Sequence, residues 1–87
     1  MQFEDFVHEV DTAIRASAAI DRFELPQANE ARWQTRARNA AIALVPPRNI
    51  SVTLAGTAEA PGTRWYPIDA ALVAVVSKRI AAYLGEA

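Results

Sequence analysis

Apolar residues at the start of the chain recur at helical spacing. Phe3, Val7, Val10 and Ile14 fall on one stripe, which Phe6 widens. This pattern predicts a helix over residues 3–18, with acidic residues in its first turn that suit the positive end of the helix dipole. We also expect a short helical turn over 19–24. Leu25-Pro26 would end that turn, because a residue before proline avoids the α region.

A second helix is predicted from Asn29, which would serve as its N-cap, to about Leu44, before Pro46-Pro47. One large aromatic residue and several small ones form its stripe: Trp33, Ala37, Ala40, Ala41 and Leu44. The small residues would let the helix approach a neighbour closely. If Trp33 is buried, its indole nitrogen needs a hydrogen-bond partner.

From Ile50 the hydrophobic period changes to two. Three apolar residues alternate with smaller or polar ones, in the order Ile50, Ser51, Val52, Thr53, Leu54 and Ala55. This alternation is typical of a half-buried strand. We expect a loop over 56–62 and a short returning strand over 63–66, which Pro67 confines to a sheet edge. Together these segments predict a β-hairpin.

The last predicted helix runs from Ala70 to Leu84, with Asp69 as its N-cap and Gly85 just past its end. Its apolar arc contains Leu72, Val73, Val76, Ile80, Tyr83 and Leu84, with Val75 at the edge, and small residues occupy the opposite side at Ala70, Ala74, Ser77 and Ala81. A helix that is apolar or small nearly all round is buried on two sides. A chain of 87 residues can hardly cover both, so a partner surface is expected.

These elements predict a single α+β domain over residues 1–87: three helices and a β-hairpin in the order α-α-β-β-α, with the last helix central. The chain contains no cysteine, which fits a reducing cytoplasm and leaves no disulfide framework. The acidic start does not resemble a signal peptide, and no apolar run is long enough to cross a bilayer. We therefore expect a cytoplasmic protein with no membrane partner.

Candidate catalytic chemistry is sparse. With three glycines in the chain, neither a phosphate-binding loop nor a dinucleotide fingerprint can be written. His8 is the only histidine, on a helix face with Glu4, Asp11 and Arg15 that looks exposed. These residues could hold a divalent metal, but a ladder of exposed pairs, with Asp11 and Arg15 at the favourable i, i+4 spacing, accounts for them better. We expect no enzyme activity, metal or cofactor.

Charge is unevenly distributed along the chain. Residues 1–11 contain four acidic residues and no Lys or Arg, for a net charge of −4. Residues 27–48 contain four arginines and one glutamate, for a net charge of +3. The two segments could simply lie near each other, or the basic one could bind an acidic partner.

The favoured hypothesis is a non-enzymatic protein-binding module: an adaptor, an inhibitor or a small assembly component that self-associates through its last helix. The candidate contact residues are Leu72, Val75, Val76, Arg79 and Tyr83, with Trp65 and Tyr66 as aromatic anchors. Trp65 and Tyr66 could instead close the hairpin over the core.

The alternative hypothesis is a dimeric DNA-binding regulator. The order of a helix, an Arg-rich helix and a hairpin is that of a winged helix-turn-helix. Arginine and asparagine side chains can read base edges in the major groove, and the candidates are Arg32, Arg36, Arg38 and Asn39. The negative net charge of the chain disfavours this alternative.

Overall fold

The first predicted helix is confirmed. The computed structural model describes residues 1–56 and 63–85, and its first element is α1 (Phe3–Ser17). The residues that α1 buries are those of the predicted stripe: Phe3, Phe6, Val7, Val10 and Ile14. The predicted pair on its outer side is also present, with Arg15 Nε 2.9 Å from Asp11 Oδ1.

The next segment is a sheet, which corrects two predicted helices. Residues 19–24 and 29–44 are not helical and instead contribute to three strands: β1 (Arg22–Gln27), β2 (Glu30–Gln34) and β3 (Arg38–Val45). β1 pairs antiparallel with β2, and β2 with β3. In the turn between β2 and β3, the Thr35 amide donates to the Arg38 carbonyl at 2.8 Å. The predicted stripe from Trp33 to Leu44 therefore belongs to two strands.

Alanine explains the error. Trp33 and the alanines fit a period of 3.6, but the inward side chains of β2 and β3 also fit a period of two on either side of a turn. The residues that this sheet buries are Ala31, Trp33, Ala40 and Ile42. Alanine favours helices and is depleted in strands, so local propensity pointed the wrong way. A helix would have left Ile42 on its polar side, whereas β3 places Ile42 in the core.

The predicted hairpin forms, but within a larger sheet. β4 (Asn49–Gly56) and β5 (Thr63–Pro67) pair antiparallel, and β4 also pairs with β3. The strand order is β1-β2-β3-β4-β5, so the chain builds a five-stranded antiparallel meander within residues 1–56 and 63–85. The element order is α-β-β-β-β-β-α, and the predicted three-helix domain is wrong. Residues 57–62, where the loop was predicted, lie outside the described part of the chain.

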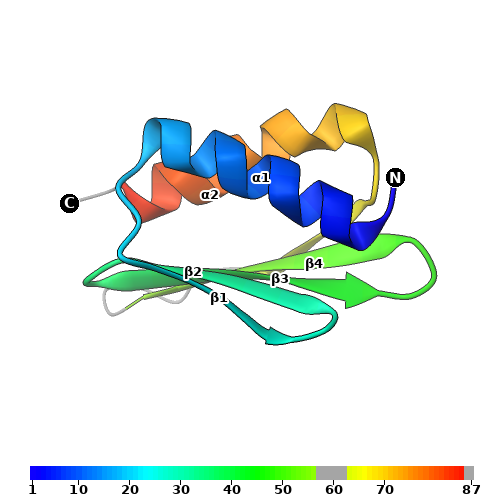
Figure 1. Ribbon diagram of the computed structural model, residues 1–87, viewed down its shortest axis with the longest axis horizontal. Helices are drawn as coiled ribbons and strands as arrows, with labels where there is room; N and C mark the ends of the chain where they lie inside the picture. The colour runs from blue at the N-terminus through cyan, green and yellow to red at the C-terminus, as the bar shows by residue number, and fades with distance from the viewer. Residues whose placement is uncertain (57–62, 86–87) are drawn as a thin grey trace.

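The last helix begins where the sequence indicates. The carboxylate of Asp69 accepts a hydrogen bond from the Ala71 amide at 2.9 Å, which caps a 3-10 turn, η1 (Ala70–Leu72). The α-helix α2 (Val73–Leu84) continues directly from η1. Figure 1 shows α1 and α2 side by side on one face of the sheet, running in the same direction. The last helix is thus one of two that cover the sheet and is not a central helix.

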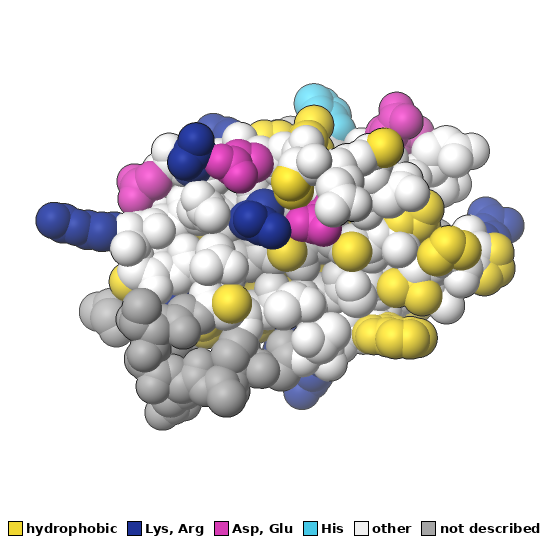
Figure 2. Space-filling model, turned by 90° about the horizontal axis from the view of Figure 1, so that it is seen from below, with side chains coloured by type: hydrophobic (Ala, Val, Ile, Leu, Met, Phe, Trp, Pro, Cys, Tyr) yellow, Lys and Arg dark blue, Asp and Glu magenta, His cyan; other side chains and the backbone are white. Residues whose placement is uncertain are grey.

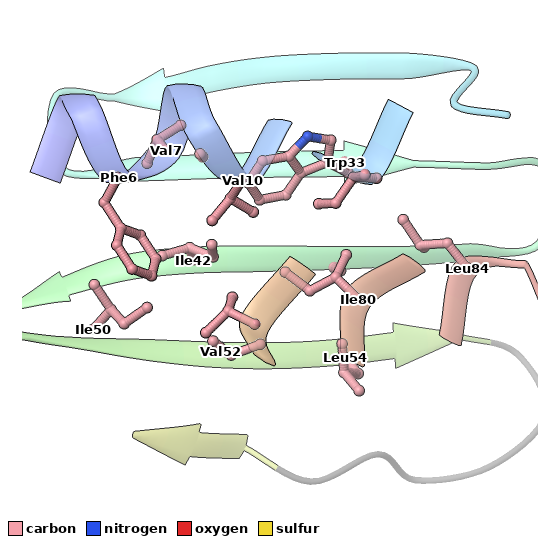
Figure 3. Close-up of a cluster of buried hydrophobic side chains, with 14 of the residues drawn as sticks. Phe6, Val7, Val10, Trp33, Ile42, Ile50, Val52, Leu54, Ile80 and Leu84 are labelled. Carbon is pink, nitrogen blue, oxygen red and sulfur yellow. The ribbon is translucent and has the colours of Figure 1, made fainter. Parts of the chain in front are cut away.

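The core lies between the helices and the sheet. Figure 3 shows side chains from α1, such as Phe6 and Val10, and from α2, such as Ile80, directed toward the inner side of the strands. Trp33 is fully buried, and its ring lies 5.3 Å from that of Phe23 on β1. The other side of the sheet, which we call the open face, faces away from both α1 and α2 (Figure 1).

Candidate functional site

A groove of about 630 Å³ lies between α1 and β1, and we call it the α1–β1 groove. Its volume falls within the range of roughly 300–1,000 Å³ that is common for binding pockets. One helix and one edge strand line it: Phe3, Glu4, Val7, His8 and Asp11 from α1, and Phe23, Leu25, Pro26, Gln27 and Ala28 from β1 and the turn that follows. Because β1 is the first strand of the sheet, the groove opens at a sheet edge.

The α1 side of the groove has an apolar floor and a polar rim. Phe3 and Val7 belong to the buried stripe of the helix, and Glu4, His8 and Asp11 lie beside it. These three polar residues were predicted to share one face of the helix, and in the structure they lie along one groove. Among the described residues, no group of His, Cys, Asp and Glu is arranged to hold a metal ion.

The β1 side of the groove was missed by the sequence analysis. Phe23 is half-buried against the core, whereas the Leu25 side chain is 64% exposed. The signal was present, because Phe23 and Leu25 alternate with the polar residues Arg22 and Glu24. Expecting a helical turn over 19–24 concealed this alternation.

The charged groups of the groove are acidic. Asp11 already accepts hydrogen bonds from the Trp33 indole at 2.8 Å and from Arg15 Nε at 2.9 Å. Glu4 is exposed and forms no salt bridge with any residue in the described part of the chain. No Lys or Arg is among the described residues that line the groove. Glu4 is therefore the carboxylate best placed to meet a cation from outside.

The candidate contact residues on α2 are mostly turned inward. Val76 is fully buried, which rules it out as a surface contact, and Leu72, Arg79 and Tyr83 are partly buried. Of the five, only Val75 is exposed, at 48%. Part of each apolar or small side of α2 is covered by the chain itself.

The sheet covers one side of α2, through Val76, Ile80 and Leu84. On the other side Ser77 and Ala81 lie opposite Ala13 and Ser17 of α1. The helix α1 therefore covers part of the small side of α2, while Ala70, Ala74 and Val75 stay exposed, so a partner surface on α2 stays a prediction.

The two aromatic candidates on β5 point to opposite sides of the sheet. Tyr66 packs partly buried against the core, but Trp65 is 67% exposed on the open face, paired across the strands with Ser51. Figure 2 looks onto the open face, where hydrophobic side chains are scattered among white, uncharged atoms. Arg22–Glu24 and Arg32–Glu30 are ion pairs on the same face, so four of its charges are already matched.

The four residues proposed to read DNA do not form one surface. Arg32 is on the open face, paired with Glu30 at 3.1 Å, and Asn39 is half-buried beside it in the sheet. Arg36 is exposed in the turn. Arg38 instead holds α2, donating to the Tyr83 carbonyl at 3.0 Å with its guanidinium 4.6 Å from the Tyr83 ring centre. The recognition helix that the DNA-binding hypothesis needs does not exist, because these residues belong to β2, β3 and their turn.

Comparison of the chain with protein-family models, curated proteins and solved structures finds no significant match. The described residues include no helix that is long and apolar enough to cross a membrane. The function must therefore be argued from the surfaces themselves.

Proposed function

We propose that this protein is a non-enzymatic protein-binding module and that its contact surface is the α1–β1 groove. The observation that supports this proposal is the combination of an apolar floor, an exposed leucine and unmatched acidic charge at one place. Phe3, Val7 and Phe23 supply the floor, and Leu25 extends it to the surface. A large apolar side chain that remains exposed beside a groove favours association, because covering it removes apolar area from water.

The groove has a stronger claim than the other exposed apolar positions. Met1, Leu25, Trp65 and Val75 are the large apolar residues that stay exposed in the described part of the chain, and of these only Leu25 lines the α1–β1 groove. Trp65 lies on the other edge strand, β5, opposite the small polar residue Ser51, and is not among the residues that line the α1–β1 groove. Val75 has exposed alanines near it, at Ala71 on η1 and at Ala74 and Ala82 on α2. Self-association through α2 stays a prediction.

The three exposed residues provide matched probes of the three surfaces. Leu25→Ser, Val75→Ser and Trp65→Ser each remove one large exposed side chain and introduce no charge. Because all three side chains are about half exposed or more, each variant should fold normally. The wild type and the variants are used as bait in extracts of the cells that make the protein, and the captured proteins are identified by mass spectrometry.

We expect a partner that the wild type, Val75→Ser and Trp65→Ser retain and that Leu25→Ser loses. Circular dichroism and thermal unfolding of each bait check that the fold is intact. The proposal is overturned if Leu25→Ser captures the same proteins as the wild type. It is also overturned if capture depends on Val75 or Trp65 instead.

A further inference from the structure

We propose that the partner segment that occupies the α1–β1 groove is an amphipathic helix with Lys or Arg beside its apolar side chains. This inference rests on the proposed function and adds the chemistry of the partner. It follows from two features of the groove: the negative charge of its rim, and the proline and irregular pairing at the edge of β1 that borders it.

The charge of the groove selects a basic partner. Glu4 and Asp11 line it without a lysine or arginine among the described lining residues, and Asp11 is already bonded to Trp33 and Arg15. Asp5 and Glu9 are further exposed acids on α1, so the helix as a whole is acidic outside its buried stripe. A cation placed beside Glu4 gains attraction, whereas a carboxylate there is repelled, so charge contributes to the choice of partner.

The edge of β1 disfavours a partner that adds a strand. Pro26 has no backbone N–H to donate, and the register between β1 and β2 shifts between Glu24 and Gln27. Proline and irregular pairing are devices that block pairing at exposed strand edges. The opposite wall is α1, whose backbone amides are bonded to carbonyls of the preceding turn from Phe6 onward. We therefore expect recognition mainly through side chains.

A helix suits recognition by side chains, because it satisfies its own backbone hydrogen bonds. It presents residues at spacings of three and four along one side, and such helices commonly bind in apolar grooves. Apolar residues of the partner would contact Phe3, Val7 and Leu25, and the flanking Lys or Arg would lie near Glu4.

The test uses a yeast-display library of amphipathic helical peptides. Leucines are fixed on one side, and the flanking positions vary among Lys, Glu and Gln. The library is selected against the full chain. We expect enrichment of Lys over Glu at the flanking positions, and we expect the selected peptides to lose about tenfold or more in affinity for Leu25→Ser.

Two variants of α1 test the role of charge. Glu4→Gln should reduce the affinity of the selected peptides by about two- to fivefold, as expected for one exposed ion pair. Glu9→Gln removes the same charge from the same helix outside the groove and should have a smaller effect. Added salt should weaken binding of the peptides to the wild type, because exposed charges are screened.

The possible failures are distinguishable. Enrichment of Glu, or no charge preference, among Leu25-dependent peptides overturns the basic helix and leaves the groove as a binding surface. If no selected peptide requires Leu25 for binding, but capture of a partner from extracts does require Leu25, the inference of a helical partner is overturned and the groove remains the proposed binding surface. If neither depends on Leu25, both proposals fail. Self-association that both Leu25→Ser and Val75→Ser abolish would identify a second copy as the occupant and overturn the inference.

Discussion

The carboxylate of Asp11 on α1 accepts a hydrogen bond from the indole nitrogen of Trp33 on β2 at 2.8 Å. Trp33 is fully buried, so this bond satisfies a polar group that water does not reach. The same carboxylate oxygen accepts from Arg15 Nε at 2.9 Å and lies in the lining of the α1–β1 groove. One acidic residue thus joins the helix, the core and the candidate site.

This relationship predicts the effect of removing Asp11. Asp11→Ala should lower the free energy of unfolding by about 1–3 kcal/mol, because it leaves a buried indole N–H without an acceptor. Asp11→Asn keeps an acceptor oxygen and should cost less. Arg15→Ala removes a half-exposed partner of Asp11, whose guanidinium also lies 5.8 Å from the centre of the Phe23 ring, and should change stability by about 1 kcal/mol or less. Urea unfolding of the three variants measures these differences, and equal losses for Asp11→Ala and Arg15→Ala would contradict the assignment.

Arg38 is predicted to be structural. Its guanidinium donates to the Tyr83 carbonyl in the last turn of α2 and lies over the Tyr83 ring. A cation is favourable at the C-terminal end of a helix. Arg38→Ala should therefore destabilise the protein by about 1–3 kcal/mol. The control is Arg36→Ala, which changes an exposed arginine in the neighbouring turn and should leave the thermal unfolding midpoint nearly unchanged.

Two adjacent valines of α2 separate folding from association. Val76→Asp would bury an unpaired charge at a fully enclosed position, and we expect a loss of about 4 kcal/mol or more and an unfolded circular dichroism spectrum. Val75→Asp changes a half-exposed side chain and should retain the fold. If the chain self-associates through α2, light scattering will show a larger mass for the wild type than for Val75→Asp. A wild type with the mass of one chain would refute self-association.

The contact between the helices predicts a limit on side-chain size. Ala81 is buried on the side of α2 that meets Ala13 and Ser17 of α1. Ala81→Leu should destabilise the protein by about 1–3 kcal/mol, since the larger side chain would force the helices apart. Ala16→Leu adds the same volume at an exposed position of α1 outside this contact and should be close to neutral. Similar losses in the two variants, measured by chemical denaturation, would show that α1 does not restrict this site.

The candidate site could be only half predicted. The grouping of Glu4, His8 and Asp11 on one side of α1 follows from helical spacing alone, and the structure confirms it. That these residues border a groove depends on β1, which forms the other wall. The sequence does not indicate that β1 packs beside α1. Leu25 is an example. The alternation of apolar and polar residues around it indicates a strand, but only the order of the strands in the folded sheet places that strand at an edge.

The sequence by itself determined the elements in which local pattern, capping and propensity agree. These are α1, the strand pair β4–β5, and the start of α2 at the Asp69 cap. Tertiary structure decided the segment from Arg22 to Val45, where alanine fits helix and strand alike and pairing with β4 selects the strand. It also decided which surfaces stay exposed, because burial depends on what the rest of the chain covers. For that reason α2 packs against both the sheet and α1 but leaves Val75 exposed, while the groove beside β1 remains open.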